Sequence, residues 1–216
     1  MEVLNVIYNI LEKRMNNIED NQKEILKKKK YENDIIFNSR SNIIKSLDDI
    51  DFIIERLRND VILKNKQITF NPLFKATRDG NKSSDFHKKC DGKVQQLIFI
   101  KTTKGETFGG YTEIGFRSRG GNYEDNNSFI FSFSTKKIYG VVGGCDAIYD
   151  HKDSGPCFSG KEYCTIYIPS KMFDDESYIN KRANSNFKGI IMDYDINNGE
   201  KTFHVQEIEV YQILYG

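Results

Sequence analysis

Apolar side chains recur at alternating steps of three and four residues through the first 64 residues of the chain. An average step of about 3.5 residues keeps a narrow apolar seam on one side of a helix, which is what a coiled coil requires. The pattern therefore predicts a helical coiled-coil arm over residues 1–64. The first run of seam positions is Leu4, Tyr8, Leu11, Met15, Ile18 and Ile25, with Gln22 as a polar member. The second run is Ile36, Ile43, Leu47, Ile50, Ile54, Leu57 and Val61, with Arg40 in the seam.

The two runs do not connect in phase, because the basic residues Lys27–Lys30 lie between them. This break predicts a stutter, a kink or a helical hairpin, and the sequence leaves these possibilities open. An apolar seam exposed to water is unfavourable, so it must pack on another chain or on the rest of this one. We expect homo-oligomers formed through residues 1–64.

From about residue 65 the pattern changes to short apolar stretches separated by turn residues. All 16 glycines lie between Gly80 and Gly216, and the first proline is Pro72. Glycine and proline are disfavoured inside helices, so residues 65–216 are predicted to form a separate, mainly β domain. Short strands at this spacing favour a two-sheet antiparallel β-sandwich with a few flanking helices. The predicted strands are 94–100, 107–116, 128–134, 138–142, 147–149, 163–168, 190–194 and 201–214.

Two local features of this domain can be predicted more closely. In the last strand Phe203 and Val205 are apolar at odd positions, whereas Ile208 and Val210 are apolar at even ones. The buried face must therefore change near Gln206, which predicts a bulge or a break. A short helix is expected over 84–89, with Ser83 or Ser84 as its cap and Gly92 shortly beyond its end.

Composition narrows the functional classes. The 32 basic and 31 acidic side chains give a net charge of +1, so binding to nucleic acid is not expected. No apolar run has the roughly 18 residues of a membrane helix, so no transmembrane segment is expected. The N-terminus lacks the pattern of a secretory signal, which favours a cytoplasmic protein with reduced cysteines. Lys27–Lys30 could contact an anionic membrane surface, although a solvated charge run is the favoured interpretation.

Metal and cofactor sites are not expected. The four cysteines lack the Cys-x-x-Cys spacing of zinc sites, although a cluster of Cys145, His151 and Cys157 is conceivable. The acidic stretch 193–200 has Asn198 and His204 where a calcium loop needs glycine and glutamate, so a hairpin turn is predicted instead. Phosphate-binding glycine motifs are absent from the sequence.

Two further groups of residues could carry chemistry. Cys90 and His87 lie three positions apart on the predicted short helix and could form a nucleophilic pair, provided that the thiol has a lowered pKa. The alternative is a surface histidine beside a buried thiol. The basic loop 117–121 could bind a phosphate or a carboxylate. Its acidic flanks favour an ordinary mixed surface loop.

The order of motifs in the domain resembles the TLDc domain family. Residues 73–80 (Leu-Phe-Lys-Ala-Thr-Arg-Asp-Gly) and 86–92 (Phe-His-Lys-Lys-Cys-Asp-Gly) are similar to the opening of that domain. The stretches 97–100, 105–111 and 128–132 follow in the family's order, and 207–211 (Glu-Ile-Glu-Val-Tyr) resembles its closing strand. The resemblance covers about 150 residues from Leu73 and excludes the helical arm.

The resemblance implies a two-sheet β-sandwich. It also implies a role in oxidative-stress resistance and binding to the vacuolar proton-pumping ATPase, in some relatives with disassembly of the pump, and it brings no established catalytic mechanism. The chain departs from the family at Ser159, where glycine is usual, so a role of that loop is in doubt. Motif and loop positions then give ten candidate binding residues: Asp79, Gly80, Gly109, Gly110, Arg117, Arg119, Phe158, Gly160, Glu207 and Glu209.

The leading hypothesis is a non-catalytic interaction module that binds a protein partner through loops 117–127 and 150–160. Subunits of the vacuolar ATPase are the candidate partner that the resemblance implies. Such a partner would bring a cytoplasmic protein to the surface of acidic organelles. One alternative is a thiol-dependent redox enzyme using Cys90 and His87. Another is an oligomeric coiled-coil scaffold that the β domain merely caps.

Overall fold

The computed structural model describes residues 2–32, 41–45, 49–59, 68–159, 164–180, 186–189 and 194–215. The helices in these ranges are α1 (Glu2–Glu32), α2 (Asp51–Asn59), α3 (Ala76–Asp79), α4 (Ser83–Cys90) and α5 (Tyr194–Asn197). A first sheet contains β1 (Ile68–Lys75), β2 (Gln96–Thr102), β3 (Thr107–Thr112), β5 (Phe129–Ser132), β6 (Lys137–Gly140) and β12 (Val205–Tyr215). A second sheet contains β4 (Asn122–Glu124), β7 (Asp146–Tyr149), β8 (Cys157–Ser159), β9 (Cys164–Tyr167), β10 (Ser177–Ile179) and β11 (Thr202–Phe203).

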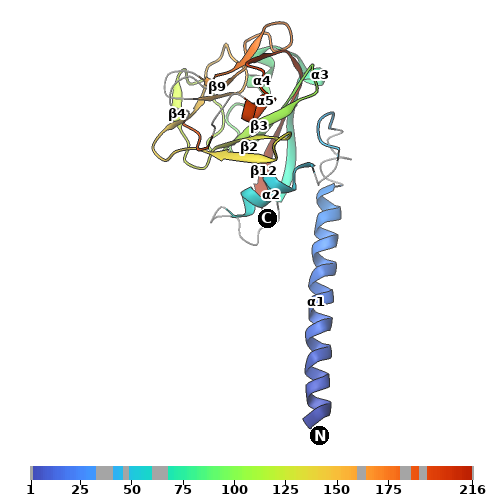
Figure 1. Ribbon diagram of the computed structural model, residues 1–216. Coiled ribbons are helices and arrows are strands. Elements are labelled where there is room, and N and C mark those ends of the chain that lie inside the picture. The colour runs from blue at the N-terminus through green and yellow to red at the C-terminus, as the bar shows by residue number, and fades with distance from the viewer. Residues whose placement is uncertain are drawn as a thin grey trace.

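The strands form two antiparallel sheets of six strands each, which confirms the predicted mainly β fold. The strand order is β1-β12-β2-β3-β5-β6 in the first sheet and β11-β10-β9-β8-β7-β4 in the second. Figure 1 shows the strand-rich body at one end of the molecule, with α1 extending from it.

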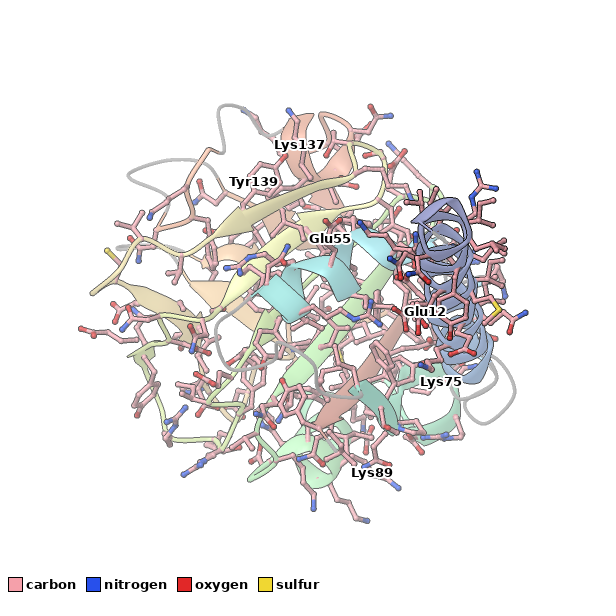
Figure 2. All side chains as sticks on the ribbon, turned by 90° about the horizontal axis from the view of Figure 1, so that it is seen from below. Glu12, Glu55, Lys75, Lys89, Lys137 and Tyr139 are labelled. Carbon is pink, nitrogen blue, oxygen red and sulfur yellow. The ribbon has the colours of Figure 1, made fainter. Side chains whose placement is uncertain are left out.

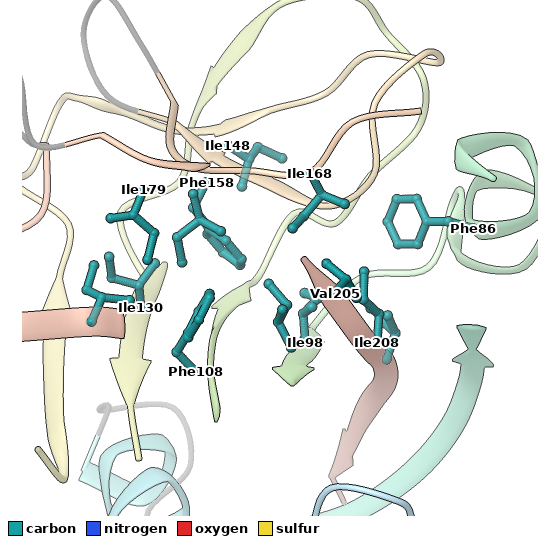
Figure 3. Close-up of a cluster of buried hydrophobic side chains, with 14 of the residues drawn as sticks. Phe86, Ile98, Phe108, Ile130, Ile148, Phe158, Ile168, Ile179, Val205 and Ile208 are labelled. Carbon is teal, nitrogen blue, oxygen red and sulfur yellow. The ribbon is translucent and has the colours of Figure 1, made fainter. Parts of the chain in front are cut away.

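The core of the sandwich lies between the two sheets. Ile98 and Ile208 contribute to it from the first sheet, and Phe158 and Ile166 from the second. Figure 3 shows these layers meeting, with Phe86 of α4 at the side. All of these side chains are 0% exposed. Burial of this kind stabilises the fold by about 1.5–3 kcal/mol for each large apolar side chain.

The other face of the first sheet is also apolar. In β2, Ile98 and Ile100 point into the sandwich, whereas Leu97 and Phe99 belong to a second buried cluster on the opposite side. The sequence of β2 is therefore a continuous apolar run, because both faces of the strand are buried.

An N-terminal cover, made of residues 41–45 and of residues 49–59, which include α2, lies over this second face (Figure 2, where Glu55 of α2 is labelled). Its buried side chains are Ile43, Ile44, Ile50, Ile53, Ile54 and Leu57. These residues include much of the second apolar run of the sequence. The described part of the run therefore packs on the chain's own β domain, which was one of the two outcomes expected of an apolar seam.

The helix expected over the N-terminal residues is interrupted, since residues 41–45 are not helical. Ser41 begins the cover by accepting hydrogen bonds at Oγ from the backbone N–H groups of Ile43 (3.1 Å) and Ile44 (2.8 Å). Such local side-chain bonds compete with helix formation. Four positions of the second run, Ile36, Arg40, Leu47 and Val61, lie outside the described residues.

Helix α1 extends away from the β body, with the N-terminus at its far end (Figure 1). Its first apolar seam is exposed to solvent, from 54% at Leu11 to 71% at Leu4. None of the described helices has the length and apolarity needed to cross a membrane.

Strand β12 and helix α4 test two local predictions. The register of β12 against β2 shifts between Val205 and Glu207, which confirms the irregularity expected near Gln206. The short helix exists as α4, but its N-cap is Lys82 and not a serine, because the Asp85 carboxylate accepts the Lys82 backbone N–H at 3.1 Å.

The region around residue 194 differs from the prediction. A strand was expected over 190–194 and a hairpin turn after it, but residues 194–197 form α5. Asn198 (φ 45°) and Gly199 (φ 89°) then end that helix in the left-handed region. Residues 190–193 lie outside the described part of the chain.

Close packing of the sheets depends on Gly110 in β3. A Cβ atom at this position would lie 2.6 Å from Cε1 of Phe158, so the aromatic ring occupies the space that a side chain would need. Gly109 is equally confined, because its Cβ would lie 2.9 Å from Cζ of Phe131 and would collide with the backbone of Ile98. Both glycines therefore serve packing.

We predict that Gly110→Ala lowers the free energy of unfolding by about 1–3 kcal/mol, because the Phe158 ring must move. Gly143→Ala is the matched control, since its Cβ would lie 3.8 Å from the nearest atom, Asn126 Oδ1. Urea unfolding followed by tyrosine fluorescence measures both. Equal midpoints for the two variants would contradict the packing role of Gly110.

Candidate interaction surface

Two segments that the sequence marked as binding loops lie side by side. Strand β4 pairs with β7, with Asn122 opposite Tyr149, and the backbone N–H of Gly121 donates to the carbonyl of Asp150 at 3.2 Å, so the segment 117–127 adjoins the described part of the segment 150–160 at Asp150. We call these two segments the loop surface. The first is partly a strand, which the sequence did not predict, because three residues are too few for an alternating pattern to be recognised.

The carboxylate of Asp150 organises this surface from below. Asp150 is 0% exposed. Its Oδ1 accepts the backbone N–H of Ser118 at 2.9 Å, and its Oδ2 accepts Nε of Arg119 at 2.8 Å. The backbone N–H groups of Arg117 (3.1 Å) and Arg119 (3.3 Å) also donate to Oδ2. Charge-assisted bonds of this kind are about twice as strong as neutral ones.

The basic loop 117–121 therefore does bind a carboxylate, and it is one from the same chain. The sequence left open whether the loop binds an external anion or is an ordinary surface loop. Its amide groups are already engaged by Asp150, so they do not form a free anion site. The side chain of Arg119 also donates to the carbonyl of Gly115 (3.2 Å) and stacks over the Tyr123 ring (3.8 Å).

The buried carboxylate of Asp125 likewise accepts hydrogen bonds from the backbone near the other end of the loop. It is 3% exposed, and its Oδ2 accepts Oγ1 of Thr112 and the backbone N–H of Glu113, both at 2.7 Å. Its Oδ1 accepts the N–H of Asn127 at 3.2 Å. Two buried carboxylates thus fix the path of the chain between β3 and β5, while Arg117 and Glu124 stay exposed.

His87 connects α4 to both segments of the loop surface. Its Nδ1 lies 2.7 Å from Oδ1 of Asp91, whose Oδ2 accepts the hydroxyl of Ser118 at 2.6 Å. Its Nε2 lies 3.0 Å from the carbonyl oxygens of His151 and Ser154. His87 is only 8% exposed, so the alternative of a surface histidine is wrong.

This network also removes the basis for a nucleophilic pair. Both nitrogens of His87 face oxygen atoms, and Cys90 is not among its hydrogen-bonding partners. Burial raises the pKa of the Cys90 thiol well above its ordinary value, and the charge of Asp91 raises it further. A nucleophilic cysteine needs the opposite shift.

Glu207 and Glu209 of β12 hold the N-terminal cover. The Oε1 of Glu209 accepts the backbone N–H of Asn42 at 2.6 Å, and its Oε2 accepts the hydroxyls of Ser41 (2.5 Å) and Tyr211 (2.9 Å). Glu207 accepts Nδ2 of Asn42 at 2.9 Å. The two glutamates are 2% and 1% exposed, so they are anchors inside the domain and are covered from a partner.

Helix α3 completes this acidic cluster. Thr77 donates its backbone N–H (3.1 Å) and its hydroxyl (2.5 Å) to Glu207. Lys75 joins the two ends of the cluster, because its Nζ lies 3.6 Å from Glu209 and its backbone N–H donates to Asp79 at 2.9 Å. The hydrogen bond from Arg78 lowers the pKa of Asp79 below its ordinary value.

Nine of the ten candidate residues fall into three groups. Arg117 and Arg119 belong to the loop surface, and Asp79, Glu207 and Glu209 to the acidic cluster, where Gly80 lies beside Asp79 with a φ of 121°. Gly109, Gly110 and Phe158 belong to the core. Gly160 lies outside the described residues. Ser159, where the family usually has glycine, ends β8 next to a shift in register.

Sequence reasoning missed the residues that build these groups. Asp150 lies about 30 positions from the amides that it binds, and Ser41 lies 168 positions from Glu209. No local pattern signals such contacts. Across the described ranges, no three His, Cys, Asp or Glu side chains come together as a group that could hold a metal ion.

We predict that Cys90 reacts with iodoacetamide roughly tenfold more slowly than the partly exposed Cys145, because its raised pKa leaves little thiolate. Peptide mapping by mass spectrometry, on native protein at about pH 8, measures both rates. In concentrated urea the rates should become similar, which controls for local sequence effects. Faster labelling of Cys90 in the native protein would restore the thiol-enzyme hypothesis.

Comparison with known proteins now places the chain. A model of the TLDc domain matches residues 37–214, which is most of the chain. The match begins well before Leu73 and includes the N-terminal cover. No curated protein matches the sequence. The fold, the order of motifs and this match agree, and the chain belongs to the TLDc domain family.

Proposed function

We propose that this protein is a non-catalytic interaction module that binds and regulates the vacuolar proton-pumping ATPase and contributes to oxidative-stress resistance. The family supports a role in protein interaction. Binding would act on the pump by favouring one assembly state, since a ligand shifts an equilibrium only through differential affinity. The protein would then lie in the cytoplasm, at the surface of acidic organelles.

The observation that carries this proposal is the buried carboxylate of Asp150 beneath the loop surface. A loop that is ordered before binding loses little conformational entropy when a partner docks. The backbone of 117–121 is held by Asp150, whereas Arg117, Lys152 and Asp153 remain exposed above it. The surface is thus a rigid frame that presents charged side chains.

Helix α1 would serve a separate purpose in the proposed function. We place the boundary between the arm and the TLDc domain after α1, close to residue 37, and not near residue 64 as the sequence suggested. In this arrangement α1 joins copies of the chain, and the domain binds the partner. The scaffold alternative shares the exposed seam of α1 but assigns no partner to the domain.

We predict that the tagged full chain recovers pump subunits from lysate of its native cell, and that Arg117→Glu with Lys152→Glu reduces recovery about tenfold. The reason is that both side chains project from the loop surface. The matched control, Lys137→Glu with Lys188→Glu, makes the same change of charge at exposed sites elsewhere and should bind normally.

Two results would contradict the proposal. Recovery of no pump subunits by the full chain would exclude the partner. Equal recovery by the loop variant and its control would exclude the loop surface. A chain without residues 1–32 should still bind the partner, whereas the scaffold alternative predicts that it loses all association.

A further inference from the structure

We propose that α1 forms a parallel, in-register coiled coil with a second copy of this chain, through a seam that runs from Leu4 to Ile25. The inference deepens the self-association included in the proposed function and rests on that part of it. It adds the direction of the helices, their register and the consequence for the β domains.

The seam fits a heptad repeat, in which positions a and d face the partner helix. Tyr8, Met15 and Gln22 occupy a, and Leu4, Leu11, Ile18 and Ile25 occupy d. The apolar members are 54–71% exposed. An ion pair between Asp20 and Lys23 (3.4 Å) lies at the outer positions f and b, where both side chains stay in water. Val6, Ile7 and Ile10 lie outside the a and d positions and are also 49–57% exposed, so the apolar surface is wider than the seam near the N-terminus and narrows to the seam from Leu11 onward.

The chain's own β domain does not cover this seam. The first sheet is already buried on one face by the second sheet and on the other by the N-terminal cover. Neither of the two described core clusters includes a residue of α1. Over residues 4–25 the helix is about 33 Å long, which suffices for three heptads. An isolated apolar stripe of this length favours association with another helix.

Charges beside the seam select a parallel arrangement. Arg14 occupies position g and Glu19 position e of the next heptad. In a parallel coiled coil these positions face each other, so each Arg14 meets a Glu19 of the other copy. In an antiparallel pair the e positions face one another, which would bring Glu12 and Glu19 of the two copies together and cause repulsion.

Gln22 sets the register in the same way. It is the polar residue among the a positions, and only a parallel, in-register pair places the two Gln22 side chains opposite each other, where their amides can hydrogen-bond. Any other alignment places a Gln22 amide against an apolar side chain, at the cost of an unsatisfied polar group.

A parallel arrangement places the β domains of both copies at the same end of the coiled coil. Two loop surfaces would then be available to one assembly at once, and the second binding event would become intramolecular. An antiparallel pair would hold the domains at opposite ends, about one helix length apart.

Disulfide trapping tests the direction. In a Cys145→Ser background, which removes the partly exposed native cysteine, Tyr8→Cys should cross-link to itself under mild oxidation, as should Ile25→Cys in a second chain. Lys13→Cys, at the outer position f, is the control and should remain uncross-linked. In a mixture of the Tyr8→Cys and Ile25→Cys chains, the parallel arrangement gives only homotypic links, and a Tyr8→Cys to Ile25→Cys link overturns the proposal.

Charge reversal tests the register independently. Arg14→Glu should weaken self-association about five- to tenfold, and the double variant Arg14→Glu/Glu19→Arg should restore it, because two equivalent pairs form in each dimer. Lys13→Glu makes a similar change of charge on the outer face and should have no effect. Sedimentation equilibrium of the full chain measures each constant.

A monomer of 25.1 kDa at all concentrations would overturn the inference, as would failure of the double variant to restore association. Recovery of the partner in pull-downs is a separate readout. Self-association without pump binding would contradict only the proposed partner, and pump binding by a monomeric chain would contradict only the coiled coil.

Discussion

The first sheet is apolar on both faces, and the rest of the structure follows from covering it. Ile98 and Ile208 require the second sheet, whereas Leu97 and Phe99 require a cover on the opposite side. The second sheet packs on only one face of the first, so the N-terminal cover supplies the layer on the other face. Its buried isoleucine and leucine side chains together stabilise the domain by on the order of ten kcal/mol, comparable with the whole stability of a domain.

Buried carboxylates fix the positions of the N-terminal cover and the loop surface, which apolar burial alone does not determine because it is not directional. Glu207 and Glu209 bind Ser41 and Asn42 at the edge of the cover, and Asp150 binds the amides of the loop surface. In both places a buried carboxylate is satisfied by hydrogen bonds and orders a segment distant in sequence. Removing such a donor leaves a buried charge without compensation, which is more costly than losing an ordinary contact. Buried carboxylates therefore stabilise the N-terminal cover in one part of the domain and order the loop surface in another.

The sequence predicted the sandwich, the irregularity in β12 and the family, because alternation and ordered motifs are local signals. It did not show where the second apolar run packs, since steps of three and four suit a helix on a sheet as well as a helix in a coiled coil. The strands β4, β8 and β10 have three residues each, which is too short for an alternating pattern to be recognised, so the sequence did not predict them. The adjacency of His87 and Cys90 suggested chemistry, but folding gave His87 other partners.

The central claim is that the N-terminal cover is an integral layer of the domain and α1 is not. Urea unfolding of three chains tests it most directly: the full chain, residues 37–216 and residues 65–216. The account predicts that residues 37–216 unfold at the same urea concentration as the full chain, whereas residues 65–216 lack a cooperative transition or aggregate. A chain of residues 65–216 as stable as the full protein would contradict the account.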